Sequence, residues 1–248
     1  MTGVLDAILA AKARRAPYAG PDRSGLPRRS LTAALAGSAQ LVVIAEFKRR
    51  SPSGGAIAPD GDPERTARAY EQAGAAALSV LTEPEFFAGS AGDLDVARTV
   101  SRLPVLRKDF LVDEKDIWES RRMGADAILL IVRVVGDALA DLLQAASAAG
   151  LEALVEVHDE AEAEAALTVG AKLVGVNNRD LDTLTTDLAT TRRLLPLLRG
   201  RALIVSESGL STAEQCRALA AEGVDAFLIG EALLRGTGDA ILGAELRL

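Results

Sequence analysis

Aromatic residues, cysteine and histidine are scarce in this chain of 248 residues. Phe, Trp and Tyr together make up 3% of it, which argues against a carbohydrate or single-stranded nucleic-acid surface built on stacking rings. The single cysteine, Cys216, cannot form an internal disulfide and fits the reducing cytosol. We expect a cytoplasmic protein in which Cys216 packs inside a helix and is not a nucleophile. No cluster of His, Cys and Asp has the spacing of a metal site.

Long apolar runs and basic segments are also missing. The longest clean apolar run is Ala127–Val132, far short of the roughly 18 residues that a membrane span needs. The net charge of −7, without any sustained run of Lys or Arg, argues against nucleic acid as a partner. At the N-terminus Asp6 precedes every basic residue, so this segment is predicted to be an amphipathic helix and not a signal peptide. One face of that helix carries its apolar residues, Val4, Leu5, Ile8 and Leu9.

Lysine is rare even among the basic residues. The chain has 23 Arg and only 5 Lys. Because Lys can be tuned to release its proton and Arg cannot, each position that is Lys is more informative than usual.

Eight short runs rich in Val, Ile, Leu and Ala recur every 20 to 30 residues. Each is nearly continuous in apolar character, as in strands of a parallel sheet that are buried on both faces. The predicted strands are Leu41–Glu46, Ala76–Leu81, Pro104–Lys108, Asp126–Ile131, Glu152–Val157, Leu173–Asn177, Ala202–Glu207 and Asp225–Ile229. Helical periodicity separates them, over Pro63–Ala73, Leu94–Val100, Glu114–Met123, Asp137–Ala149, Glu160–Val169, Leu188–Leu195 and Thr212–Ala221.

This alternation is typical of either a doubly wound sheet or a closed barrel. Eight equal repeats without an internal linker favour the barrel, which commonly takes about 250 residues as one domain. We therefore predict an α/β protein, a (β/α)8 TIM barrel with extra N-terminal helices. Residues 1–248 form a single domain in this prediction, with a helical extension over 1–40 and the barrel over 41–240.

Charged side chains follow the predicted strands at their C-terminal ends, where such barrels place their active sites. Glu46 and Lys48 share one direction along the first strand because side chains alternate. The pair could be a structural salt bridge, and Lys108 and Glu156 could equally be a buried ion pair. Together they place two ammonium and two carboxylate groups at one mouth, which is costly to desolvate without a charged ligand.

The last two strands end in glycine turns. Ser208-Gly209 closes the seventh strand and Gly230 the eighth, and a helix is predicted to begin after each. A single glycine at a strand end usually marks only a turn. Two at adjacent strands predict backbone N–H groups near Gly209 and Glu231 that converge on a phosphate.

Other polar residues carry weaker signals. The only histidine, His158, lies just past a strand, and we expect a solvated loop residue that catalysis does not need. Asp109 is expected to anchor a loop. Arg49 and Arg50 could either be solvated or steer an anion. No G-x-G-x-x-G follows a strand, so no dinucleotide site is predicted.

Seven motifs at successive strand ends resemble indole-3-glycerol phosphate synthase, a barrel enzyme of tryptophan biosynthesis. The resemblance runs from about Leu41 to Arg235, and the N-terminal helices are also expected in this family. The motifs are IAEFKRRSPSGG, LTEPEFFAGS, VLRKDF, LVEVHD, VGVNNRDL, SESGL and FLIGEALL. The resemblance implies a lyase that converts carboxyphenylamino-deoxyribulose 5-phosphate into indole-3-glycerol phosphate, carbon dioxide and water. It implies no cofactor and no metal.

By this resemblance, four residues act in the chemistry. Lys108 corresponds to a general acid that protonates the ketone oxygen during ring closure, and Glu156 to its carboxylate partner and candidate base. Glu46 and Lys48 correspond to a pair that serves the later dehydration. We expect burial and the neighbouring cations Lys48 and Arg107 to lower the pKa of Lys108 toward the working pH, with Glu156 opposing that shift.

The same resemblance supplies the binding residues. Asn177 and Ser208 correspond to hydrogen-bonding residues, Ser51 and Arg179 to substrate contacts, and the Gly209 and Gly230 turns to the phosphate cradle. Glu231 stands where some members have Ser, and we expect its carboxylate to turn away from the phosphate. The partner is thus a phosphorylated small molecule, and the chain is expected to be a monomer or weak homo-oligomer.

Two other functions compete with this one. Another phosphate-binding barrel, such as an aminoaldose or ribulose phosphate isomerase, would want an Asp or Cys acid–base pair where this chain has Glu46, Lys48 and Lys108. A non-catalytic barrel could bind a phosphorylated ligand or a partner enzyme, but the presence of both Lys108 and Glu156 favours an enzyme.

Overall fold

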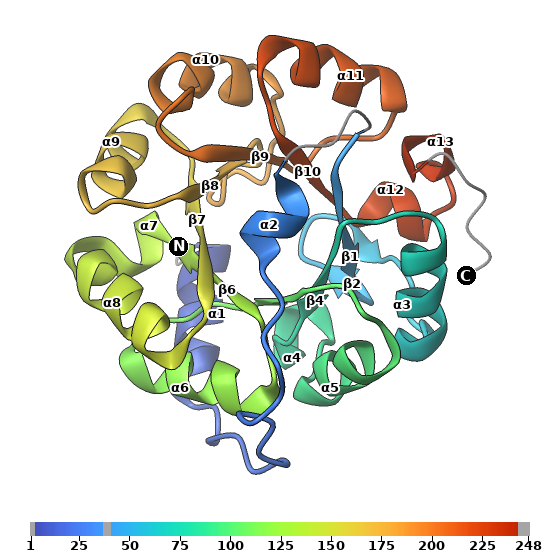
Figure 1. The fold of residues 1–248 in the computed structure, drawn as a ribbon, viewed down its shortest axis with the longest axis vertical. Helices are drawn as coiled ribbons and strands as arrows, with labels where there is room; N and C mark the ends of the chain where they lie inside the picture. The colour runs from blue at the N-terminus through green and yellow to red at the C-terminus, as the bar shows by residue number, and fades with distance from the viewer. Residues whose placement is uncertain (1–2, 37–40, 243–248) are drawn as a thin grey trace.

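The chain forms a closed barrel of eight parallel strands surrounded by helices (Figure 1). The computed structural model describes residues 3–36 and 41–242. The strands follow one another around the barrel in the order β1-β10-β9-β8-β7-β6-β5-β4. They are β1 Val43–Phe47, β4 Ala77–Leu81, β5 Val105–Lys108, β6 Ala127–Ile131, β7 Glu152–Val157, β8 Leu173–Asn177, β9 Leu203–Glu207 and β10 Ala226–Ile229. The predicted fold class is confirmed.

The helices pack around the outside of the barrel. The larger ones are α3 Pro63–Gln72, α5 Ala91–Val100, α6 Glu114–Met123, α8 Leu139–Ala149, α9 Glu160–Thr168, α10 Ala189–Leu198 and α11 Ala213–Glu222. Helix α12 (Glu231–Leu234) begins after Gly230 as predicted. The short elements absent from the prediction are β2 Arg50–Ser51, β3 Gly55–Ala56, α4 Pro84–Phe87, α7 Val132–Val135, the 3-10 turn Gly136–Ala138 and α13 Asp239–Leu242. Helix α5 begins three residues before its predicted start, because the Ser90 side chain accepts a hydrogen bond from the Asp93 amide and caps it.

Alternation along each strand separates two cores. Side chains such as Ile44, Leu106 and Leu154 point inward and pack inside the barrel. Their chain neighbours, such as Val43 and Val105, point outward and pack against the helices. The same alternation decides which polar side chains at the strand ends face the barrel axis.

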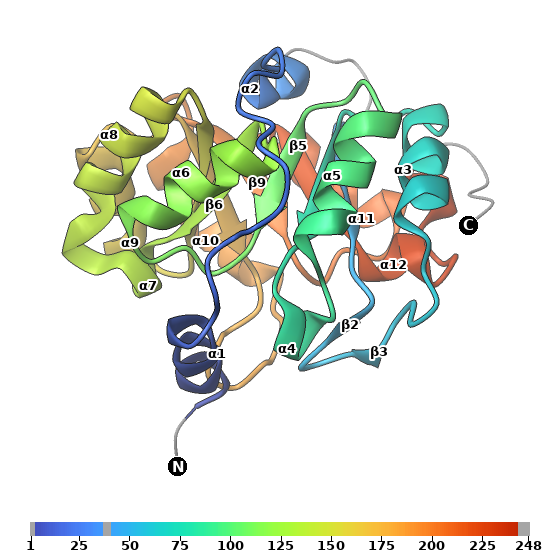
Figure 2. The same ribbon diagram turned by 90° about the horizontal axis from the view of Figure 1, so that it is seen from below.

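The N-terminal segment reaches both ends of the barrel. Helix α1 (Val4–Ala13) lies at the same end as α4 and the β2–β3 hairpin, whereas α2 (Leu31–Leu35) covers the opposite end (Figure 2). Because β2 follows the C-terminal end of β1, α1 lies over the end where a barrel carries its active site. Ile8 of α1 and Leu31 and Leu35 of α2 are buried and belong to the inner core.

Candidate active site

A cavity opens at the C-terminal strand ends, beneath α1. Its empty space, including the open mouth, is about 1120 Å³. One part of its wall is apolar and includes Val4, Leu5, Ile8, Leu81, Phe87, Phe110, Leu129, Ile131, Leu181 and Leu184. Every site residue predicted from the sequence lines it: Glu46, Lys48, Ser51, Lys108, Glu156, Asn177, Arg179, Ser208, Gly209, Gly230 and Glu231.

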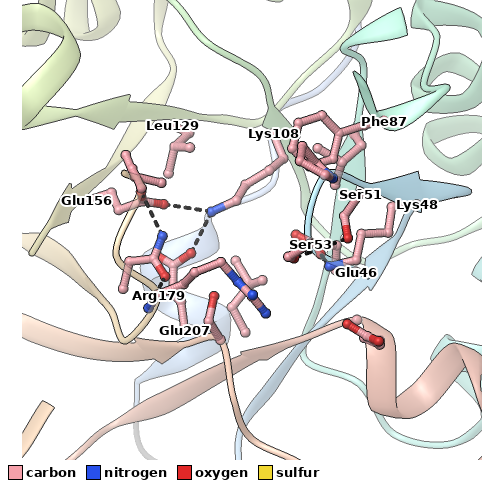
Figure 3. Close-up of a pocket in the computed structure, with 18 of the residues that line it drawn as sticks. Glu46, Lys48, Ser51, Ser53, Phe87, Lys108, Leu129, Glu156, Arg179 and Glu207 are labelled. Atoms are coloured by element: carbon pink, nitrogen blue, oxygen red, sulfur yellow. Dashed lines mark hydrogen bonds and ion pairs between the residues drawn. The ribbon is translucent and has the colours of Figure 1, made fainter. Parts of the chain in front are cut away.

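Lys108 stands at the centre of the charged wall (Figure 3). Its Nζ lies 2.9 Å from Glu156 Oε2 and 2.5 Å from Glu207 Oε2. Burial would lower the pKa of Lys108, but the charges of Glu156, Glu207 and Glu46 outweigh burial and raise it. The expected lowering of the Lys108 pKa is therefore wrong, because carboxylates and not cations surround this ammonium group.

Glu156 is held by several donors. Its side chain is 2% exposed, its Oε2 pairs with Lys108, and its Oε1 accepts a 3.0 Å hydrogen bond from Asn177 Nδ2. Burial raises the pKa of Glu156, but the Lys108 charge and contact with His158 lower it further than burial raises it. Glu156 is thus a carboxylate in the folded chain.

Glu207 belongs to the same cluster, and the sequence interpretation missed it. It ends β9 and points inward in register with Val205, so strand alternation was a signal that could have found it. Burial and the neighbouring carboxylate Glu156 raise the pKa of Glu207 to about 7, against the lowering effect of Lys108. Its Oε1 fills space over Gly175 of β8, where an added Cβ would lie only 2.0 Å away.

Glu46 and Lys48 form a second ion pair on another part of the wall, as Figure 3 shows. Lys48 Nζ lies 2.6 Å from Glu46 Oε1. Glu46 packs against Gly230, where a Cβ would come within 2.7 Å of the same oxygen. Glycine at this strand end therefore leaves room for the Glu46 side chain.

Two turns and a loop border the mouth near this pair. Ser208 and Gly209 both have left-handed φ angles, 67° and 76°, a conformation that is uncommon for a residue other than glycine. Ser51 Oγ accepts a hydrogen bond from the Gly54 amide and so shapes the β2–β3 loop. Glu231 accepts a 3.0 Å hydrogen bond from Arg235 Nε.

Arg179 also borders the cavity. Its guanidinium donates to the Leu184 carbonyl at 3.0 Å, which holds the arm of this cation against the loop after β8. Arg179 therefore reaches the cavity wall from this loop (Figure 3).

Arg107, expected beside Lys108, points the other way. It is fully buried between β5 and α6, where it donates to Thr82, Ser120 and Asp109. Consecutive strand residues face opposite sides, so Arg107 and Lys108 cannot share the mouth. Asp109 anchors its loop as predicted, since it also accepts from Thr82.

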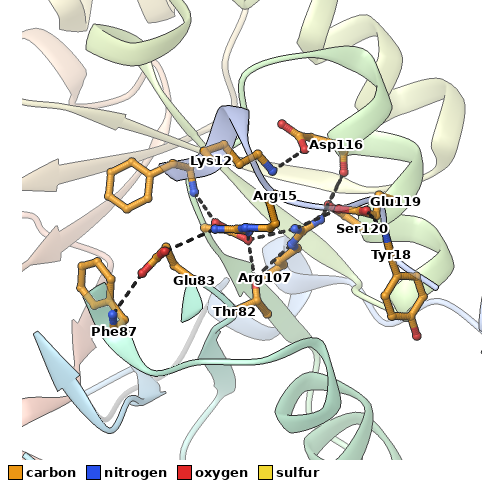
Figure 4. Close-up of polar contacts among 12 residues, drawn as sticks. Lys12, Arg15, Tyr18, Thr82, Glu83, Phe87, Arg107, Asp116, Glu119 and Ser120 are labelled. Carbon is orange, nitrogen blue, oxygen red and sulfur yellow. Dashed lines mark hydrogen bonds and ion pairs between the residues drawn. The ribbon is translucent and has the colours of Figure 1, made fainter. Parts of the chain in front are cut away.

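This outer network holds α1 in place (Figure 4). Arg15, just past the helix, pairs with Asp109 at 2.7 Å and with Glu83 at 3.5 Å. Within the helix, Lys12 pairs with Asp116 of α6. The apolar face of α1 is thereby fixed over the cavity.

His158 is buried, so the expected solvated loop residue is wrong. It is 7% exposed, and its ring lies between Glu156 and Glu162. It does not appear in the cavity wall. Helix α9 covers it, because Glu162 one turn into that helix accepts hydrogen bonds from both its backbone and its ring.

The remaining predictions concern Arg49, Arg50 and Cys216. Arg49 makes two hydrogen bonds to Asp93, of 2.6 and 2.8 Å, and lies over the Phe47 ring. This pairing fixes the loop after β1, while Arg50 donates to the Glu85 carbonyl. Cys216 is buried in α11, and burial raises the pKa of its thiol to about 12.

Within residues 3–36 and 41–242, no three His, Cys, Asp or Glu side chains are placed to hold a metal ion. None of the helices in this part of the chain has both the length and the apolar character needed to cross a membrane.

Solved structures share the fold. An N-acetylmannosamine-6-phosphate 2-epimerase from Clostridium perfringens has a TM-score of 0.61 at 16% identity, over 84% of this chain and 93% of that one. A mutant tryptophan synthase alpha-subunit from Pyrococcus furiosus has a TM-score of 0.58 at 15% identity, over 78% of this chain and 88% of that one. At such identities the likeness shows the barrel alone.

Sequence comparisons are more specific. The family profile described as indole-3-glycerol phosphate synthase matches residues 7–242. The indole-3-glycerol phosphate synthase of Syntrophobacter fumaroxidans is 50% identical over 214 residues, 85% of this chain and 81% of that protein. Indole-3-glycerol phosphate synthase 2 of Streptomyces coelicolor is 51% identical over 214 residues, 84% and 81% of the two chains. On this evidence the chain belongs to the indole-3-glycerol phosphate synthase family.

Proposed function

We propose that the cavity under α1 carries out the reaction of this family through Lys108, Glu156 and Glu207. The chain is an indole-3-glycerol phosphate synthase, a carboxy-lyase of tryptophan biosynthesis. Its substrate is 1-(2-carboxyphenylamino)-1-deoxyribulose 5-phosphate. The observation that carries the assignment is one ammonium group held between two buried carboxylates, at 2.9 and 2.5 Å, in the wall of the cavity.

Substrate binding uses the two sides of the cavity. The apolar wall formed by α1, Phe87, Phe110 and Leu129 suits the aromatic ring. The turns at Gly209 and Gly230 suit the phosphate, with backbone N–H groups as donors.

Further contacts come from the polar rim. Ser51 and Arg179 are assigned to substrate binding, and Arg179 can neutralise an anionic group of the substrate. Ser208 is assigned a hydrogen bond to the substrate. Glu231, paired with Arg235, leaves only its backbone to the phosphate.

Ring closure joins the ring carbon that bears the carboxylate to the ketone carbon. The electron pair of the C=O bond moves to oxygen, and Lys108 gives that oxygen a proton. The alkoxide that forms is basic enough to take a proton from an ammonium group whose pKa is raised. Glu156, held by Asn177, orients Lys108, and Glu207, with its pKa near 7, returns a proton to it.

Decarboxylation and dehydration follow. The bond to the carboxylate breaks and releases carbon dioxide. Expulsion of the hydroxyl with a proton and removal of a ring-carbon proton then complete the indole. The Lys48–Glu46 pair supplies an acid and a base for this step, separate from the Lys108 cluster.

The direct test adds the purified chain to the substrate and follows indole fluorescence and the mass of the product, with EDTA present throughout. We expect product from the parent chain and no detectable ring closure from Lys108→Met or Glu156→Gln. Lys115→Met is the matched control, because Lys115 is exposed on α6 and does not line the cavity. Absence of product from the parent would refute the proposal.

We propose a cytoplasmic enzyme that acts on a soluble phosphorylated substrate as a monomer or weak homo-oligomer. Size-exclusion chromatography with light scattering checks the oligomeric state.

A further inference from the structure

The ring of His158 lies beside Glu156 of the catalytic cluster but does not line the cavity. Its Nε2 is 3.4 Å from Glu156 Oε1, and its Nδ1 is 3.0 Å from Glu162 Oε2. Asn177 holds the same Glu156 oxygen from β8. His158 thus touches a residue assigned to the chemistry without touching the cavity.

The two carboxylates determine the charge of this ring. A neutral imidazole that donates from Nδ1 to Glu162 would turn the lone pair of Nε2 toward Glu156 Oε1. Nε2 is buried and has no well-aligned hydrogen-bond partner, although it is within ion-pair distance of that oxygen. A protonated ring removes this repulsion because both nitrogens then carry hydrogen.

Charged groups from three helices lie around His158, and its direct ring contacts are with carboxylates. From α9, Glu162 accepts from the backbone amide of His158 at 2.7 Å as well as from the ring. From α7, Arg133 neutralises the other oxygen of Glu162 at 3.1 Å and also meets Asp182. From α10, Arg193 donates to the His158 carbonyl at 3.3 Å, away from the ring.

The two remaining acidic groups of this region are engaged elsewhere. Asp159 caps α9 by accepting from the Glu162 amide, and Glu160 pairs with Arg193. Burial lowers the pKa of His158, but its contacts with Glu156 and Glu162 raise it to about 9. At neutral pH the ring is therefore an imidazolium.

Charges consequently alternate in sign from α7 to the cavity. The series is Arg133, Glu162, His158, Glu156 and Lys108. We propose that His158 is a positioning residue, whose imidazolium, clamped by Glu162, keeps Glu156 ionised and aimed at Lys108. This inference depends on the role of Glu156 proposed above.

A titration without substrate tests the geometry. His158 is the only histidine of the sequence, so one set of imidazole NMR signals reports it in the chain freed of any tag. We expect its pKa near 9, and a fall of about one unit or more in Glu156→Gln and in Glu162→Gln. Glu164→Gln is the control on the same helix, because Glu164 is exposed and pairs with Arg201. The proposal would be overturned by a His158 pKa near the ordinary value of about 6.5 that does not change in Glu156→Gln.

Kinetics test the consequence for catalysis. We expect His158→Gln to lower kcat about tenfold or more with KM within about threefold, because a displaced carboxylate affects the chemical step. The kcat of the parent should fall above about pH 9, and this alkaline limb should be absent in His158→Gln. Glu162→Gln should move the alkaline limb of the kcat profile to lower pH. Glu164→Gln should change neither kcat nor the position of this limb.

The possible failures are distinguishable. An unchanged kcat and an unchanged alkaline limb in His158→Gln would overturn the positioning role even if the pKa is high. Full activity of Glu156→Gln would instead remove the catalytic role of Glu156, and with it the function proposed for the cluster. The NMR titration would still show whether His158 is paired with Glu156 and Glu162, because it does not depend on activity.

Discussion

Replacement of Lys108 by Arg separates the charge of this residue from its ability to give up a proton. Arg keeps a cation between Glu156 and Glu207, so both carboxylates retain a partner. Guanidinium has a pKa above about 12 and stays protonated throughout the reaction. We expect Lys108→Arg to bind substrate within about tenfold of the parent and to lose about a hundredfold or more in kcat.

The structure also sets the magnitude expected for the uncharged variant. Lys108→Met leaves two carboxylates, each with a side chain 2% exposed, without their shared cation. Loss of one partner from a buried pair costs about 3–5 kcal/mol of unfolding free energy. The catalytic loss of a hundredfold corresponds to about 2.7 kcal/mol of activation free energy. Lys108→Met should therefore be both inactive and less stable, whereas Lys108→Arg should be inactive with little loss of stability.

The assay is single-turnover ring closure followed by indole fluorescence, with urea unfolding of each variant measured in parallel. Arg is longer and planar, so steric misfit is the main confounding effect, and the Met variant controls for it because its length is close to that of Lys. Ring closure by Lys108→Arg at nearly the parent rate would show that Lys108 supplies only charge and that the proton comes from another group.

Three more predictions follow from the glycines and from Glu231. Gly230→Val should raise KM about tenfold or more and also lower kcat, because its side chain would displace Glu46, and steady-state kinetics checks both. Glu231→Ser should leave KM unchanged or lower it, and a loss of binding would contradict the view that this carboxylate avoids the phosphate. Gly175→Ala should lower kcat about tenfold by moving Glu207, and in a Glu207→Gln background it should have little further effect, which a double-mutant cycle measures.

Much of the site could be predicted because strand alternation is a local rule. Glu46, Lys48, Lys108, Glu156 and Asn177 were all expected at the strand ends, and all line the cavity. The fold followed from the spacing of the apolar runs, which sets strands and helices without reference to distant residues.

The predictions for three residues differ from the structure for two different reasons. Strand alternation places Arg107 on the opposite side from Lys108 and turns Glu207 inward, so both positions could have been predicted from the sequence. The burial of His158 depends on tertiary packing, because α9 covers this residue only in the folded chain.

The position of α1 over the cavity could not be predicted from local patterns either. The ion pair that helps to hold it joins Lys12 to Asp116, which lie 104 positions apart in the sequence.

The long reach of the N-terminal segment also has a consequence for biosynthesis. At about 5–20 residues per second, a ribosome needs roughly 5–20 s to make the 104 residues that separate Lys12 from Asp116. The interval is longer still for Ser30 at the start of α2, whose hydrogen-bond partner Glu152 is made 122 residues later. During this interval the apolar faces of α1 and α2 have no barrel to cover, so the nascent chain exposes Ile8, Leu31 and Leu35 until its later strands emerge. The segment that finally closes both ends of the barrel is thus made before the surfaces that cover it.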